Sequence, residues 1–197
     1  MTYSKMSLKG NAGIVTIITL FLLFNLIFLS FYNDVWWDSS VYIGMGKYIY
    51  SLGKIGLWES SRPLVWPIIL GFFWKIGLDQ VFFGKIIIIL FSVGCSIITY
   101  LICLKLWDKT TAIFSALLFS FTPTVFIFSN IIYSDIPSAF FLLVGIYFFL
   151  ENKHHLSGLL FGIAFMTRFY HIFFLIPIVL IYSFWLLKKK IQVRNII

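Results

Sequence analysis

Charged residues are scarce in this 197-residue chain, which has a charged fraction of 11% and only seven acidic side chains. A soluble domain carries about 25% charged residues. This shortage, an apolar fraction of 61% and a mean hydropathy of +1.01 together exclude a soluble fold. Only two cysteines are present, Cys95 and Cys103, about two helical turns or roughly 12 Å apart, too far for a disulfide. We expect them to pack as small apolar side chains.

Several motifs of soluble enzymes are missing as well. The sequence has no P-loop, no GxGxxG after a strand, no HExxH and no CxxC, so nothing indicates a nucleotide-binding or metalloprotease domain. The net charge of +8 does not indicate nucleic acid, because the basic residues form short clusters between apolar runs. Such clusters are typical of orientation signals and of contacts with anionic lipid headgroups. We therefore expect membrane lipids as partners and one transmembrane domain over residues 1–197.

The chain does contain long apolar runs with almost no charge, the pattern of transmembrane helices. The first run is too long for the apolar region of a signal peptide and predicts an uncleaved helix. The second contains Pro63, Pro67 and Lys75 and is shorter than the ~20 residues that a span needs, so we expect it not to cross the membrane. The apolar runs cover residues 12–32, 63–78, 84–104, 110–129, 136–150, 156–169 and 171–187.

The basic residues between these runs indicate the orientation of the chain. Lys and Arg are enriched in cytoplasmic loops, and most of them fall on one side if the second run does not cross. That set is Lys5, Lys9, Lys105, Lys109, Lys153, Lys188, Lys189, Lys190 and Arg194. The fold class that we predict is an all-α protein of the cell membrane with six transmembrane helices, two outer juxtamembrane helices and both termini in the cytoplasm.

The predicted outer loop, 33–83, contains the two juxtamembrane helices. Helical spacing of apolar residues predicts a surface helix over about 40–52, and the run 63–78 is expected to dip into the outer leaflet. In the surface helix the side chains expected to face lipid or core are Tyr42, Met45, Ile49 and Leu52. Further along, Gly158 and Gly162 form a GxxxG pair that predicts close helix packing.

Four charged residues near the outer surface have two interpretations each. Asp38 and Asp135 precede predicted helices, so each is either an N-cap or a carboxylate that faces an outer cavity. A carboxylate at that depth is suited to act as general base toward a hydroxyl. Arg62 and Arg168 either extend toward lipid headgroups or bind a phosphate through paired N–H donors.

Four segments carry a resemblance to a known family. They are residues 37–43 (WDSSVYI), 61–67 (SRPLVWP), 134–141 (SDIPSAFF) and 158–169 (GLLFGIAFMTRF). In order and spacing they resemble the N-terminal half of GT-C membrane glycosyltransferases. More narrowly, they resemble the protein mannosyltransferase and aminoarabinose transferase group, which uses dolichyl- or undecaprenyl-phosphate sugars.

The resemblance implies roles for the four charged residues. Asp38 matches the catalytic carboxylate of that group, and Arg62 matches its basic residue at the lipid phosphate. Asp135 and Arg168 match further motif positions and are expected to bind substrate. Two departures are that Ser39 stands where the group often has Glu, and that Arg168 replaces Lys. Members of the group are usually longer, so we expect this chain to be a truncated copy, a split gene product whose partner chain supplies the missing helices, or a minimal relative.

The expected function is transfer of a sugar from a polyprenyl-phosphate donor to an acceptor on the extracytoplasmic face. The alternative is a non-catalytic membrane subunit or a component of a lipid or solute transporter. Transporters tend to place ionisable residues at the membrane midplane, whereas the helix interiors here carry almost no charge. The sequence leaves the sugar, the acceptor and any need for a divalent metal open.

Overall fold

The computed structural model describes the backbone of residues 12–31 and 35–194, and side chains within 12–29 and 35–185. The predictions that concern Lys5, Lys9 and the end of the first run at Tyr32 lie outside the described residues. The described part of the chain consists of helices joined by turns and loops and contains no strand. The helices are α1 (Ala12–Phe31), α2 (Trp37–Tyr50), α3 (Val65–Lys75), α4 (Gln80–Leu106), α5 (Lys109–Phe121), α6 (Pro123–Phe128), α7 (Asp135–Leu150), α8 (His154–Thr167), the 3-10 turn η2 (Phe169–His171) and α9 (Ile172–Arg194).

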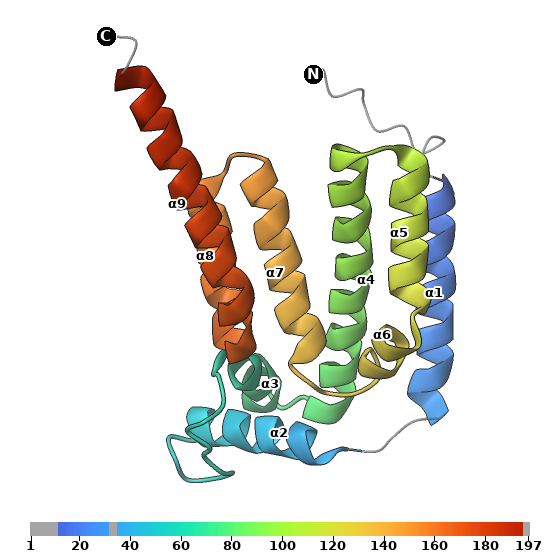
Figure 1. Ribbon diagram of the computed structural model, residues 1–197. Helices are drawn as coiled ribbons and strands as arrows, with labels where there is room; N and C mark the ends of the chain where they lie inside the picture. The colour runs from blue at the N-terminus through green and yellow to red at the C-terminus, as the bar shows by residue number, and fades with distance from the viewer. Residues whose placement is uncertain (1–11, 32–34, 195–197) are drawn as a thin grey trace.

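The long helices run lengthwise and change direction from one to the next (Figure 1). α1 begins and α9 ends at one end, where the α4–α5 and α7–α8 turns also lie; we call this the hairpin end. At the opposite end α2 and α3 lie across the bundle, close to the starts of α4 and α7. We call it the α2–α3 end. The run 63–78 therefore forms a helix that lies across the others rather than beside them.

Helix length and composition identify two strong candidates for membrane crossing among the described residues. These are Ala12–Leu29 in α1 and Gln80–Leu106 in α4. The other apolar helices are shorter. At about 1.5 Å per residue, α7 is about 24 Å long, less than the hydrocarbon core of about 30 Å. Helix length by itself therefore supports fewer crossings than the six that the sequence predicts.

The predicted run 110–129 is interrupted, and the prediction of one continuous helix there was wrong. α5 ends at Phe121, Thr122 is extended, and α6 begins at Pro123. Proline has no N–H to continue the helix, and it disfavours helical backbone in the preceding residue. Asp108 opens α5 as an N-cap, because its carboxylate accepts a hydrogen bond of 2.8 Å from the backbone N–H of Thr111.

The predicted surface helix is confirmed as α2, but it begins and ends earlier than 40–52. Tyr42 and Met45 are buried as expected. Leu52 is outside the helix, at a positive φ of 55°, and its side chain is 89% exposed, so its placement on the helix was wrong. α2 approaches α3 closely at Gly46, where an added Cβ would lie 2.7 Å from Pro67 O and from Gly71 N. Only a residue without a side chain fits this crossing.

The predicted close packing at the GxxxG pair is not observed. No atom of a neighbouring element lies within 4 Å of a Cβ built on Gly158 or Gly162. The glycine that α7 and α8 need is Gly145, whose Cβ would lie 2.6 Å from the ring of Phe161. The Ser157 hydroxyl also donates a 2.8 Å hydrogen bond to Gly145 O. The prediction rested on residue spacing alone, and spacing does not show which face of a helix packs against a neighbouring helix.

Two clusters of buried side chains hold the bundle. One lies at the α2–α3 end, where it joins α2, α3, α4 and α7, and Trp66 is fully buried in it. The other joins α1, α4 and α5. Cys95 and Cys103 are buried free thiols, which confirms their assignment as packing residues. By contrast, the outward faces of α1 and α9 are apolar and exposed, with Ile181 at 71%, as expected of surfaces that contact lipid.

Candidate active site

Asp38 is held in the first turn of α2, directed toward the segment that leads into α3. The N-cap of α2 is Trp36, and no side chain caps this helix. The Asp38 carboxylate instead accepts a 2.7 Å hydrogen bond from Nη2 of Arg62, 24 residues further along the chain. The N-cap interpretation of Asp38 was therefore wrong. The close crossing of α2 and α3 brings this acid and base together.

Arg62 is fixed from several sides. Its Nε donates to Glu59 Oε1 at 3.0 Å, and Glu59 also accepts from the Ser61 hydroxyl at 2.9 Å. The guanidinium carbon lies 5.0 Å from the centre of the Tyr42 ring, a cation–π contact. Burial alone would lower the pKa of Arg62, but its hydrogen bonds to Asp38 and Glu59 and its contact with Tyr42 outweigh burial and raise that pKa above its usual value. The side chain stays a positioned cation, 19% exposed.

A second acid–base pair lies at the start of α7. The N-cap of α7 is Ser134, without a side-chain cap, and Asp135 is the first helical residue. The Asp135 carboxylate accepts a hydrogen bond from Nη1 of Arg168, which follows the end of α8. Arg168 also donates through Nη2 to the Tyr170 hydroxyl at 3.0 Å, and its guanidinium stacks on that ring. The N-cap interpretation of Asp135 was wrong for the same reason as that of Asp38.

Two tyrosines connect the pairs. Tyr42 contacts Arg62 through its ring. Its hydroxyl lies 2.9 Å from the hydroxyl of Ser134, the residue before Asp135. Burial raises the pKa of Tyr133, and the negative charges of Asp38 and Asp135 raise it further. One phenol therefore experiences both carboxylates. The four predicted residues form two ion pairs that are neighbours at the α2–α3 end.

This arrangement has the groups that transfer from a phosphate ester requires. Each guanidinium carries five N–H donors, and Arg62 and Arg168 each use two in the contacts above. The Nε–H of Arg168 is buried, but the remaining Nη donors suit phosphate oxygens, which guanidinium groups bind in pairs. Both carboxylates are partly exposed. From the sequence we predicted no role for Glu59 and placed Tyr42 among the apolar side chains of the surface helix. The hydroxyl of Tyr42, on an otherwise apolar helix face, was the feature that could have indicated its part in the site.

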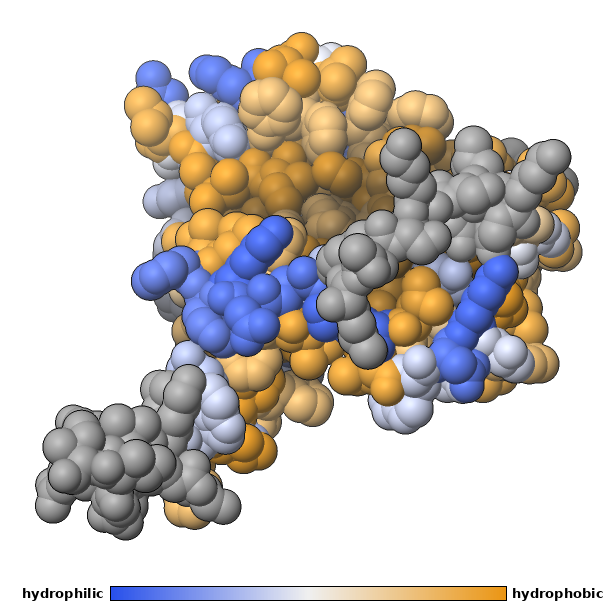
Figure 2. Space-filling model, turned by 90° about the horizontal axis from the view of Figure 1, so that it is seen from above, coloured by the Kyte–Doolittle hydropathy of each residue, from blue (hydrophilic) through white to orange (hydrophobic). Residues whose placement is uncertain are grey.

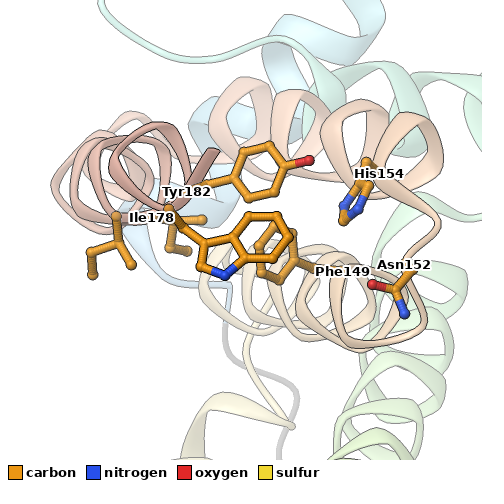
Figure 3. Close-up of a pocket in the computed structure, with 7 residues that line it drawn as sticks. Phe149, Asn152, His154, Ile178 and Tyr182 are labelled. Atoms are coloured by element: carbon orange, nitrogen blue, oxygen red, sulfur yellow. The ribbon is translucent and has the colours of Figure 1, made fainter. Parts of the chain in front are cut away.

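Two of the cavities in the described part of the chain lie away from these ion pairs. The one beside the start of α2 has a volume of about 290 Å³, and its lining includes Trp36 and Asn130. The larger one, about 380 Å³, lies near the hairpin end between α9 and the α7–α8 turn (Figure 3). Neither is lined by Asp38 or Arg62. Among the described side chains no three His, Cys, Asp or Glu groups are placed to hold a metal ion.

Comparison with known proteins gives one match. A family model described as dolichyl-phosphate-mannose-protein mannosyltransferase matches residues 61–196, a stretch that contains Arg62, Asp135 and Arg168. No curated protein matches, and no solved structure matches. The matched stretch is more than half of the chain, and it confirms the resemblance drawn from the sequence motifs. The chain therefore belongs to the dolichyl-phosphate-mannose-protein mannosyltransferase family, whose membrane-embedded members in general transfer sugars from polyprenyl-phosphate donors.

Proposed function

We propose that this protein transfers a sugar from a polyprenyl-phosphate donor to an acceptor hydroxyl at the α2–α3 end, on the extracytoplasmic face. The observation that carries the proposal is the pairing of Asp38 with Arg62 beside the pair of Asp135 and Arg168. Two cations and two carboxylates, all partly exposed at one end of an apolar bundle, suit a reaction on a phosphate at headgroup depth. The family match supports the class of donor.

In this proposal Asp38 is the general base. Its carboxylate accepts the proton of the acceptor hydroxyl while the hydroxyl oxygen attacks the anomeric carbon of the sugar. The bond between that carbon and the phosphate oxygen breaks, and the electron pair leaves with the polyprenyl phosphate. Arg62, together with Arg168, stabilises the charge that develops on the leaving phosphate. A single displacement of this kind inverts the anomeric configuration.

The ion pairs also give the reaction an order. Before the donor arrives, Arg62 is bonded to Asp38, so the base is neutralised by its neighbour. A donor phosphate competes for the same guanidinium and frees the carboxylate to accept a proton. We therefore propose that the donor binds before the acceptor. Asp135 holds Arg168 in the same manner and completes the substrate-binding set.

The orientation is part of the proposal. Six crossings, by α1, α4, α5, α7, α8 and α9, would place the α2–α3 end outside and both termini in the cytoplasm. This is supported by the alternating directions of these helices (Figure 1) and by the basic residues in the segments at the hairpin end. Helices shorter than the hydrocarbon core are accommodated by local thinning of the bilayer. A partner chain remains an expectation.

The test is substitution of the proposed base with a matched control. Asp38→Asn should lower transfer from a polyprenyl-phosphate sugar by about 100-fold or more, the usual contribution of a general base. Asp79→Asn is the control, because Asp79 caps α4 at the same end with a 2.6 Å hydrogen bond, and Asn caps a helix equally well. Full activity in Asp38→Asn would contradict the mechanism. Binding of donor without transfer in any assay would favour a non-catalytic subunit or transporter component.

A further inference from the structure

The larger cavity lies at the opposite end of the molecule from the two ion pairs. It opens between α9 and the turn that joins α7 to α8 and has a volume of about 380 Å³. In Figure 3, Tyr182 from α9 and Phe149, Asn152 and His154 from the α7–α8 side extend toward one another. Its lining residues are Phe149, Asn152, His154, Ile178, Ile181, Tyr182 and Trp185.

The walls of the cavity are apolar and aromatic. The Tyr182 ring lies 5.4 Å from Phe149, 5.1 Å from His154 and 6.1 Å from Trp185, measured between ring centres. Ile178 and Ile181 complete the wall on α9. Such a lining suits a hydrocarbon chain and offers little to a polar solute, because burying unpaired polar groups is costly.

One side of the cavity is polar. Asn152 and His154 come from the α7–α8 turn, where Asn152 has a φ of 60°, a left-handed conformation that Asn tolerates. Lys153 lies between them, exposed, with its ammonium 5.5 Å from the centre of the Phe148 ring. Trp and Tyr side chains favour the boundary between hydrocarbon and water. The occupant therefore has an apolar part and a polar head.

The charge of this end indicates the sign of that head. Among the residues whose backbone the structure describes, the α4–α5 and α7–α8 turns and the end of α9 contain seven of the 15 basic residues but only two acidic ones, Asp108 and Glu151. Glu151 is paired with Lys105, and Asp108 caps α5. Seen from this end, hydrophilic residues gather in groups with hydrophobic surface around them (Figure 2). An anionic head would meet an excess of positive charge.

We propose that this cavity binds an anionic glycerophospholipid. One acyl chain lies against Phe149, Ile178 and Ile181, and the phosphate of the headgroup is bound by Lys153 with Asn152. Basic pockets between helices at a membrane surface suit such lipids. The site is separate from the proposed transfer reaction and does not depend on it.

The experiment measures lipid retention by native mass spectrometry of the full chain. The purified protein is titrated with dioleoyl phosphatidylglycerol or with dioleoyl phosphatidylcholine, which differ in headgroup charge and not in chains. Ile178 is the half-buried isoleucine of the lining, so Ile178→Trp fills the cavity and should weaken binding of the first phosphatidylglycerol about tenfold, as when about two methylene groups lose their contacts. Ile176→Trp is the matched control, because Ile176 is exposed on the same helix and is not part of the lining.

A second pair of variants tests the proposed contact with the headgroup and leaves the apolar lining of the cavity unchanged. Lys153→Gln should weaken binding of phosphatidylglycerol about fivefold, the effect of one lysine near an anionic surface. Lys54→Gln, an equal loss of charge at an exposed position of the α2–α3 end, should leave it unchanged. The proposal is overturned if Ile178→Trp binds phosphatidylglycerol as Ile176→Trp does, if phosphatidylcholine binds as tightly, or if both lysine variants have the same effect.

Discussion

The crossing of α2 and α3 determines whether Asp38 meets Arg62, and one added carbon atom should disturb it. In Gly46→Ala the new Cβ would lie 2.7 Å from Pro67 O and Gly71 N. Both are backbone atoms that cannot turn aside as a flexible side chain does. Real Cβ atoms do not occur this close to other atoms, so α2 must move away from α3. Overpacking of this kind costs about 1–3 kcal/mol.

Helix propensity has the opposite effect on the free energy of unfolding, because Ala favours a helix more than Gly does. A control variant is needed to separate this effect from the cost of overpacking. Replacing Gly by Ala inside a helix favours the helix by up to about 1 kcal/mol. Gly158→Ala provides the correction, since Gly158 is inside α8 and its added Cβ would meet no atom within 4 Å. The difference between the two variants is then the cost of overpacking, about 1–3 kcal/mol.

The assay is equilibrium unfolding in mixed micelles, followed by far-ultraviolet circular dichroism, together with transfer activity. We expect Gly46→Ala to be less stable than Gly158→Ala and to lose activity, because Asp38 on α2 separates from Arg62 before α3. Equal stability of the two variants to within about 0.5 kcal/mol, the scatter of ordinary surface substitutions, would refute the close crossing. Lower stability with unchanged activity would refute its link to the site.

Three further predictions concern the Arg62 cation, the Asp108 helix cap and the orientation of the chain in the membrane. Arg62→Ala should raise the KM for the donor and lower kcat in steady-state transfer assays, and Arg62→Lys should restore part of both, since it retains the charge but not the paired donors. The pKa of Asp108 is lowered by the hydrogen bond from the backbone of Thr111; its stabilising effect is present above the usual carboxyl pKa and is lost as pH falls through the folded value. Asp108→Asn should therefore flatten the acid limb of a plot of stability against pH, and an unchanged limb would contradict the cap. A membrane-impermeant maleimide should label Lys54→Cys in intact cells and Lys153→Cys only after permeabilisation; the reverse pattern would contradict the proposed orientation.

Much of the fold was predictable because it depends on local composition. Apolar runs and helical spacing predicted most of the helices, including α2 and the short α3. The distribution of basic residues predicted that Asp38, Arg62, Asp135 and Arg168 lie at one end. The predicted helix boundaries were less accurate than the predicted helices themselves. Pro123 divides a run that composition presents as continuous, and the chain turns before Leu52. Local backbone preferences decided these points against the apolar pattern.

Only the tertiary structure decided the partners. From the sequence, Asp38 and Asp135 were equally suited to cap helices, since capping needs only a neighbouring N–H. Their actual partners, Arg62 and Arg168, are 24 and 33 residues away along the chain. The same holds for Gly46 and Gly145, which lie at close contacts, and for the GxxxG pair, which does not. Composition and periodicity describe one helix at a time, whereas an ion pair or a close crossing depends on how two helices are placed relative to each other.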